Sequence, residues 1–208
     1  MVERRKIAVF DLDGTLYAGP SLRHFFLFGA KRLASRGRVV EAAQILLRFA
    51  AWKFAGIMSH ASMKHANCRL LEKRLTRADA EQFVDSMDAR INPQVNTLLD
   101  FCRAEGYMTV LATASPAFYC EPLAKRYGFD LCTSTSTSPR RSDYVENRGR
   151  AKLDGIMELP GQLDIVVTDH HDDLPLLLAN GGGTNYLVNP SAETLRRVHE
   201  AGVNYEKL

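Results

Sequence analysis

The pattern of apolar and polar positions divides the chain into two parts of different character. From residue 91 onward, short apolar runs rich in β-branched residues alternate with segments of helical period, whereas residues 20–90 carry helical patterns only. Alternation of strands and helices is typical of a parallel sheet with helices on both faces. We therefore predict a doubly wound α/β core, formed by residues 1–16 and 91–208, and a small α-helical cap domain over residues 17–90.

Each segment of this pattern predicts one strand or helix. The expected strands are residues 6–10, 108–112, 129–133, 163–168 and 184–188. The expected helices are residues 21–35, 39–56, 59–74, 77–90, 93–105, 117–128, 151–157, 174–180 and 192–201. Ser21 is expected to cap the first helix, in preference to a role in substrate contact. The buried stripe of the second helix is expected to be Ala42, Ile45, Phe49 and Trp52.

Polar side chains follow three of the predicted strands at the point where each strand ends. Asp11 and Asp13 come directly after the first strand, Thr113 follows the second, and a run from Asp169 to Asp173 follows the fourth. The carboxyl ends of parallel strands meet at one edge of the sheet, where Lys152 is also expected to lie. Carboxylate oxygens suit Mg²⁺, and a hydroxyl and an ammonium group can hold a phosphate. A carboxylate facing that phosphate can act as a nucleophile, and another can transfer protons.

Four segments that contain these residues resemble the signature motifs of the haloacid dehalogenase superfamily. The segments are DLDGTL (11–16), VLATASP (110–116), GRAKLDG (149–155) and VVTDHHDDLPLL (166–177). The tail LVNPSAETLRRV resembles the end of the phosphoserine-phosphatase-like branch, subfamily IB, in which a helical cap follows the first motif. The resemblance implies the α/β core fold of this superfamily and the activity of a Mg²⁺-dependent phosphatase.

The resemblance also implies roles for the carboxylates. Asp11 would be the nucleophile that forms an aspartyl-phosphate, and it would bind Mg²⁺ as well. Asp13 would be the general acid/base and would offer its backbone carbonyl to the metal. Asp169 would bind the metal directly, and Asp173 would support a metal-bound water.

For the phosphate, the resemblance points to the second and third motifs. Thr113 would hydrogen-bond the phosphoryl group beside Ala114, and Lys152 would neutralise it and orient the nucleophile. The family spacing favours Thr113, the apolar helical pattern that follows favours Lys152, and the four-residue offset from Asp169 favours Asp173. The alternatives that the residues leave open are Ser115 for Thr113, Arg148 or Arg150 for Lys152, and Asp172 for Asp173.

Two histidines depart from the family pattern, which usually has a small residue after the first aspartate of the fourth motif. His170 and His171 lie among aspartates and invite a transition-metal interpretation. Adjacent residues do not easily face the same ion, however, and the fold already supplies a site for a hard cation. We expect one histidine to line the cleft and the other to face solvent.

The charge of the cap bears on the substrate. Phosphoserine phosphatases carry a cap glutamate soon after the first motif, but no acid occurs here between Asp13 and Glu41, which argues against phosphoserine. Between Pro20 and Leu75 there are eleven Lys and Arg residues and two acids. This excess suits a small metabolite with extra negative charge, or a phosphorylated lipid headgroup at an anionic membrane that the cap contacts. No nucleic-acid reader motif accompanies it, so nucleic acid is not expected as a partner.

The remaining features exclude several protein classes. No stretch of about 18 uncharged apolar residues or signal peptide is present, and the four cysteines form no CxxC pair, which suits a cytoplasmic protein. We predict a Mg²⁺-dependent phosphomonoester hydrolase. Two alternatives stay open, namely a phosphotransferase that uses the same site with another acceptor, and a non-catalytic module that binds anions or membranes.

Overall fold

A parallel six-stranded sheet forms the centre of the computed structural model, which describes residues 5–208. The strand order is β3-β2-β1-β4-β5-β6, and every pair of neighbours runs parallel. The strands are β1 (Lys6–Phe10), β2 (Met108–Pro116), β3 (Leu131–Thr135), β4 (Gln162–Thr168), β5 (Thr184–Leu187) and β6 (Glu206–Lys207). The predicted doubly wound α/β class is confirmed.

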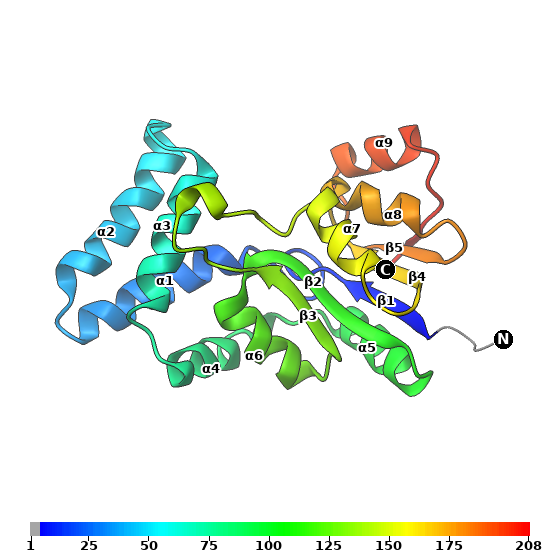
Figure 1. Cartoon of the computed structure of the whole chain (residues 1–208), viewed down its shortest axis with the longest axis horizontal. Helices are drawn as coiled ribbons and strands as arrows, with labels where there is room; N and C mark the ends of the chain where they lie inside the picture. The colour runs from blue at the N-terminus through cyan, green and yellow to red at the C-terminus, as the bar shows by residue number, and fades with distance from the viewer. Residues whose placement is uncertain (1–4) are drawn as a thin grey trace.

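Helices cover both faces of this sheet (Figure 1). One face carries α5 (Pro93–Ala104) and α6 (Ala117–Tyr127). The other carries α7 (Arg150–Met157), α8 (Leu174–Ala179) and α9 (Ala192–Glu200). The central strand β1 serves both layers, because Ala8 and Phe10 belong to one apolar cluster and Ile7 and Val9 to the other. Burial on both faces explains why the segment KIAVF is continuously apolar after its first residue.

The strand order places β1 at the point where the connections of the sheet change direction. From β1 the chain continues to β2 and β3 on one side, whereas β4, β5 and β6 lie on the other side. In open parallel sheets a crevice forms at such a point, outside the carboxyl ends of the strands. The loop that follows β1 is therefore the expected place for a ligand.

The helical insertion begins beside those carboxyl ends. Its helices are α1 (Ser21–Ser35), α2 (Val39–Ala50), α3 (His60–Glu72) and α4 (Arg77–Asp85), and a π-helical turn, Ala51–Ala55, continues α2. Figure 1 shows α1, α2 and α3 as a group at one end of the molecule, with α2 on its outer side. By contrast, α4 packs against α6 of the α/β part. The cap boundaries at residues 17 and 90 stay a prediction.

The N-terminal turn of α4 is fixed by one buried carboxylate. Thr76 and Asp79 form a reciprocal capping box. The same carboxylate of Asp79 accepts hydrogen bonds of 2.7 Å from both Arg32 and Arg36, which lie at the end of α1. Four hydrogen-bond donors from two segments thus converge on one side chain, and they hold α4 against α1.

Ser21 differs from its predicted role as a helix cap. Pro20 occupies the N-cap position of α1, and the side chain of this residue makes no capping hydrogen bond. The Ser21 side chain is instead buried, and its hydroxyl lies 3.2 Å from the Ser115 hydroxyl and 2.7 Å from that of Tyr119. Because α1 begins against the end of β2, this hydroxyl is used for a tertiary contact.

Several element bounds also differ from the prediction. The third strand runs over residues 131–135 and not 129–133, and β2 extends four residues further, to Pro116. The strand β6 was not predicted, because its two residues are charged and exposed. In α2, Ala42 and Ile45 are buried as expected, whereas Phe49 and Trp52 are only partly buried. Among residues 5–208, no helix has the length and hydropathy that crossing a membrane requires.

Candidate active site

A pocket of about 330 Å³ opens at the carboxyl edge of the sheet, between the strand ends and the helical insertion. All the residues predicted from the sequence to form the site line it. They are Asp11, Asp13, Thr113, Ala114, Lys152, Asp169 and Asp173. The structure therefore brings together segments from β1, β2, α7 and the turn after β4, as the strand-end argument predicted, whereas the role of each residue stays a prediction.

Lys152 connects two carboxylates at the bottom of the pocket. Its Nζ atom lies 2.7 Å from Oδ1 of Asp11 and 2.8 Å from Oδ1 of Asp173, and its side chain is 4% exposed. Thr168 at the end of β4 donates a further hydrogen bond of 2.8 Å to Asp173. Burial alone would lower the pKa of Lys152, but the two carboxylates raise it above its usual range. The ammonium group therefore stays charged at the base of the pocket.

Burial of the carboxylates makes the site fit a divalent cation. Burial raises the pKa of Asp11 to about 7, against the opposing charge of Lys152, and nearby Asp173 adds to the rise. Burial likewise raises the pKa of Asp169 to about 6. Several buried carboxylates beside a single ammonium group leave negative charge uncompensated. A cluster of hard oxygen donors with excess negative charge fits Mg²⁺.

Asp169 is packed directly against the loop that follows β1. Gly14 has a φ of +82°, and a Cβ atom at this position would lie 2.1 Å from Oδ2 of Asp169. The hydroxyl of Thr15 lies 3.4 Å from the other oxygen of the same carboxylate. Only a residue without a side chain allows this approach, so Gly14 is needed both for its backbone conformation and for its size.

The carboxylate of Asp13 is held by two groups from other elements. The backbone N–H of Ser21, in the first turn of α1, donates to Oδ1, and the Ser115 hydroxyl donates to Oδ2 at 2.6 Å. A helix N-terminus favours a negative charge beside it. The backbone N–H of Ser115 in turn donates to the Thr113 hydroxyl at 3.0 Å. Ser115, the alternative phosphate ligand, is thus engaged with Asp13.

The two arginine alternatives to Lys152 lie elsewhere. The side chain of Arg150 is 79% exposed and forms an ion pair within its own helix. Arg148 reaches the pocket, but its guanidinium group binds Asp172, with Nε 2.7 Å from the carboxylate. Of the three basic residues, Lys152 is the one in contact with Asp11.

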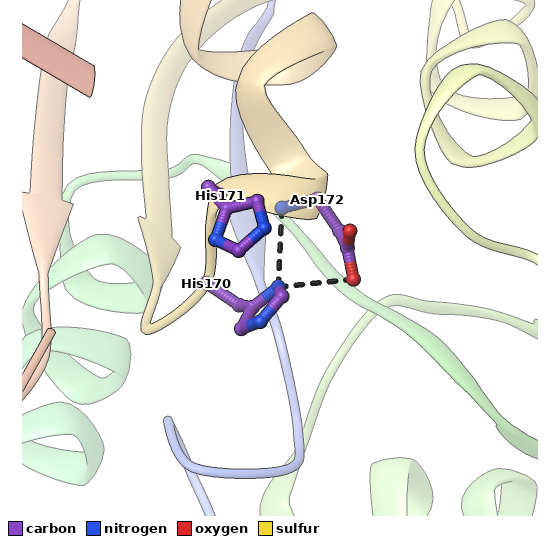
Figure 2. Close-up of side chains that lie close together, drawn as sticks. All are labelled: His170, His171 and Asp172. Atoms are coloured by element: carbon purple, nitrogen blue, oxygen red, sulfur yellow. Dashed lines mark hydrogen bonds and ion pairs between the residues drawn. The ribbon is translucent and has the colours of Figure 1, made fainter. Parts of the chain in front are cut away.

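The two histidines after Asp169 occupy different surroundings, and Figure 2 shows them with Asp172. His170 lines the pocket, and its Nδ1 atom lies 2.9 Å from the Asp172 carboxylate. His171 contacts the Thr194 hydroxyl of α9 at 3.4 Å. The nearest donor atoms of His170, His171 and Asp172 lie within 4.8 Å of one another, a spacing that a metal ion can use. Arg148 already neutralises Asp172, however, and transition-metal binding is not proposed here.

The outer wall of the pocket was not predicted. Lys64, on α3, is buried, and its Nζ atom donates to the carbonyl of Ala114 at 2.7 Å and lies 3.3 Å from the Glu146 carboxylate. The other oxygen of Glu146 is buried without a hydrogen-bond partner among residues 5–208, and it lies 4.0 Å from Nδ1 of His60. Lys64 lies within a helix and Glu146 within a loop, and neither belongs to a recognisable motif. The sequence therefore gives no signal for this wall.

Asn147 is a second residue that the sequence did not mark. Its side-chain amide donates to the carbonyls of Thr113 at 3.2 Å and Thr133 at 2.8 Å. Its backbone N–H donates to the Thr135 hydroxyl at 3.0 Å. Asn147 therefore links the ends of β2 and β3, and its hydrogen bond to the backbone carbonyl of Thr113 helps to fix the position of that residue.

Comparison with known families agrees with this geometry. A family model for haloacid dehalogenase-like hydrolases matches residues 8–178. The chain belongs to the haloacid dehalogenase-like hydrolase family. The family expected from the four motifs is thereby confirmed, and the match includes all four of them. No curated protein matches the chain in sequence.

Solved structures of other proteins, phosphoserine phosphatases among them, share the fold. A protein of unknown function from Bordetella pertussis Tohama I has a TM-score of 0.74 and 21% identity, over 97% of this chain and 98% of that one. A phosphoserine phosphohydrolase-like protein from Francisella tularensis has a TM-score of 0.56 and 13% identity, over 98% and 94%. A phosphoserine phosphatase in its apo form has a TM-score of 0.55 and 12% identity, over 98% and 92%. The fold is thus that of the branch expected from the sequence.

Proposed function

We propose that this haloacid dehalogenase-like hydrolase is a Mg²⁺-dependent phosphatase that cleaves phosphomonoesters through an aspartyl-phosphate on Asp11. The observation that carries the proposal is the arrangement of Asp11 and Lys152 at the bottom of the pocket, with Asp13 two residues further on. The ammonium group holds one oxygen of Asp11 and leaves the other available for attack. The family membership and the shared phosphatase fold support the same reaction.

In the first step, a carboxylate oxygen of Asp11 attacks the phosphorus atom, and the bond from phosphorus to the ester oxygen breaks. Asp13 gives its proton to the departing alkoxide, which leaves as an alcohol. The Ser21 N–H and the Ser115 hydroxyl fix the orientation of Asp13 for this transfer. The Thr113 hydroxyl and Lys152 stabilise the charge of the phosphoryl oxygens.

In the second step, water attacks the phosphorus atom of the aspartyl-phosphate. Asp13 takes a proton from this water, and the bond between phosphorus and the Asp11 oxygen breaks. Inorganic phosphate leaves, and Asp11 returns to a carboxylate while Asp13 is protonated again. Asp13 thus acts once as an acid and once as a base, which suits a carboxyl group whose orientation is fixed.

Mg²⁺ would be held by Asp11, the backbone carbonyl of Asp13, and Asp169, with Asp173 supporting a bound water. When bound, it would supply positive charge that offsets the repulsion between the phosphate and the buried carboxylates. Asp173 also contacts Lys152 and Thr168, so it orients the ammonium group as well.

The substrate is proposed to be a small phosphorylated metabolite or a phosphorylated lipid headgroup. A pocket of about 330 Å³ lies at the lower end of the range for small-molecule sites. An acid does reach the outer wall, but Glu146 comes from the loop after β3 and is paired with Lys64. The wall is therefore close to neutral, because its carboxylates, Glu146 and Asp172, are each paired with a basic group.

Replacing the nucleophile tests the proposal. With Mg²⁺ and p-nitrophenyl phosphate, Asp11→Asn is expected to lower turnover at least about a thousandfold, because an amide does not form the phosphoenzyme. Asp100→Asn makes the same chemical change at an exposed position of α5 and should keep wild-type turnover. Thermal melting shows whether both variants are folded. Wild-type turnover by a folded Asp11→Asn variant would refute the proposed nucleophile.

A second measurement separates hydrolysis from transfer. In water, nitrophenol and inorganic phosphate should appear in equal amounts. With added alcohols and diols, an excess of nitrophenol over phosphate would show that another acceptor takes the phosphoryl group. A screen of phosphorylated sugars, amino acids, nucleotides and lipids then identifies the substrate.

A further inference from the structure

The outer side of α2 exposes large apolar residues that no part of the described chain covers. We define the α2 outer face by six residues of α2 and the turns after it. They are Val39, Val40, Leu46, Leu47, Phe54 and Ile57. The exposed fractions reach 72% at Val40, 67% at Leu47, 83% at Phe54 and 80% at Ile57. Contiguous exposed apolar groups of this kind usually mark an interaction surface.

The exposed residues share one side of the helix. Val39 and Leu46 are seven residues apart, as are Val40 and Leu47, and a spacing of two helical turns places residues on the same face. The packed side of α2 carries the separate stripe that begins with Ala42 and Ile45. The helix is therefore apolar on two sides, although burial within the fold explains only one of them. Figure 1 shows α2 at the outer edge of its group, with α1 and α3 on its inner side.

The segment that carries the α2 outer face has a large excess of basic residues. Of the eleven basic residues between Pro20 and Leu75, all of which the structure describes, only Lys64 lines the pocket. Both acids of this segment have ion-pair or hydrogen-bond partners. Glu41 pairs with Arg38 and Arg74, and Glu72 accepts a hydrogen bond from Thr137.

Basic side chains lie at both ends of the face. Arg36 and Arg38 precede Val39 and form ion pairs with Asp79 and Glu41, whereas the exposed Lys53 precedes Phe54 and has no ion-pair partner among residues 5–208. Most of the basic charge of the cap therefore lies outside the pocket, and Lys53, unpaired among the described residues, lies beside the apolar surface, whereas attraction of a soluble substrate would require the charge to concentrate in the pocket.

We propose that the α2 outer face docks on the surface of an anionic lipid bilayer. Apolar side chains rimmed by basic ones are the features of helices that lie in the membrane interface. Over residues 39–55 such a helix is about 25 Å long, and it would lie in the plane of the membrane. A second copy of the chain fits less well, because it would bring the same positive charge against the same positive rim.

The π-helical turn that carries Phe54 also contacts the pocket wall through another of its residues. The ring of Trp52, in the π-helical turn, lies 4.9 Å from the ring of His60, and His60 lines the pocket. Docking would therefore place the pocket near the lipid surface. The proposal goes beyond the hydrolysis reaction and does not depend on it.

Co-sedimentation of the full chain with vesicles tests the docking. We expect binding to phosphatidylcholine vesicles that contain one third phosphatidylglycerol, weaker binding at high salt, and little binding to phosphatidylcholine alone. Phe54→Glu should lower the partition coefficient on anionic vesicles about tenfold. Phe101→Glu makes the same substitution at an exposed phenylalanine of α5 and should bind as the wild type does. Thermal melting and turnover of p-nitrophenyl phosphate in solution establish that both variants are intact.

Three results would overturn the proposal. The first is a wild-type chain that does not bind anionic vesicles, and the second is a Phe54→Glu variant that binds them as well as the wild type. The third is a wild-type dimer at micromolar concentration that Phe54→Glu converts to a monomer in sedimentation velocity, because the face would then be an interface between copies.

Discussion

The bottom and the outer wall of the pocket are built in different ways. At the bottom, Asp11, Lys152 and Asp173 have side chains no more than 13% exposed, and one ammonium group contacts both carboxylates. In the wall, the side chains range from 3% exposed at Lys64 to 53% at Arg148, and each basic group has an acidic partner. The bottom therefore carries uncompensated negative charge in a buried place, whereas the wall is a set of nearly neutral pairs.

Under the proposed function, the bottom of the pocket would carry out the reaction and the wall would select the substrate. Residues at the bottom come from strand ends and the first turn of α7, so the sheet fixes their positions. Residues of the wall come from α3 and the loop after β3, which meet only when the insertion packs over the sheet. We therefore expect changes at the bottom to affect turnover and metal binding strongly, and changes in the wall to affect substrate affinity more mildly.

After the loss of the nucleophile itself, the largest effect is expected on removing Lys152. Lys152→Met should lower kcat/KM by about a hundredfold to a thousandfold, because the phosphoryl charge loses a fixed partner. It should also lower the free energy of unfolding by about 3 kcal/mol at pH 8, because Asp11 and Asp173 would remain buried side by side. Kinetics and urea denaturation measure both effects. Lys125→Met, at an exposed position of α6, is the control.

The loss in free energy of unfolding should depend on pH, because the pKa of Asp11 is raised in the folded state. Burial already raises the pKa of Asp11 to about 7 in the presence of Lys152, and the variant should raise it further. An acid whose pKa is higher in the folded state stabilises the fold at low pH, and this stabilisation disappears as the pH rises through the folded pKa. The loss in free energy of unfolding caused by Lys152→Met should thus be smaller at pH 5 than at pH 8. An equal loss at both pH values would contradict the model of uncompensated charge.

Mg²⁺ binding should show the next largest effect. Because the pKa values of Asp11 and Asp169 are raised to about 7 and about 6, both residues hold protons at pH 6 that a metal must displace. The affinity should be about tenfold weaker at pH 6 than at pH 8, with proton release visible by calorimetry in buffers of different ionisation enthalpy. Glu146→Gln, in the wall, should keep this pH dependence, and a pH-independent affinity would exclude these carboxylates as ligands.

A smaller effect is expected in the wall. Lys64→Met should lower kcat/KM about fivefold to tenfold and act mainly through KM, because it removes a hydrogen bond to Ala114 and the partner of Glu146. A double-mutant cycle with Glu146→Gln should give a coupling energy of about 1 kcal/mol. Additive effects of the two substitutions would show that the pair does not act as a unit.

The smallest effect on catalysis is expected outside the pocket. Asp79→Asn should keep kcat near the wild-type value but lower the free energy of unfolding by about 2 kcal/mol at pH 6. Burial alone would raise the pKa of Asp79, but the hydrogen bonds from Arg36, Thr76 and Arg32 lower it below its usual range. A carboxylate whose pKa is lowered in the folded state stabilises the fold at pH values above its unfolded pKa of about 4. This stabilisation is lost as the pH falls through the folded pKa. The difference from the wild type should therefore shrink below about pH 4, and a constant difference would contradict this role.

The sequence predicted the bottom of the pocket because each of its residues follows a strand or opens a helix within a motif. The segment 6–10 is a strand with the predicted bounds, and Asp11 follows it directly. Alternation of short apolar runs indicates where strands end, and the ends of parallel strands meet at one edge. Lys152 was selected over its neighbours by the apolar helical pattern that follows it, and α7 begins two residues before it.

The wall and the outer face of α2 were not predictable in the same way. Lys64 and Glu146 are 82 residues apart in the chain, and their pairing depends on how α3 packs over the loop after β3. Ser21 has a residue type that suits a helix cap, but its hydroxyl contacts the end of β2, and local propensity does not anticipate such a contact. In α2 the periodicity predicted the stripe that begins with Ala42 and Ile45, which are buried, but the second apolar side was not predicted and is seen as exposed only in the packed structure.

Gly14 fixes the distance between two loops of the site through a contact that does not depend on charge. The contact between its backbone and the carboxylate of Asp169 is a contact between atomic surfaces, and it does not depend on whether either carboxyl group is ionised. In the proposed reaction, the loops after β1 and β4 would thus keep the same separation when Asp13 gains and loses its proton. Steric exclusion at one residue would then give the site a constant geometry, although its charges would change at every proposed step.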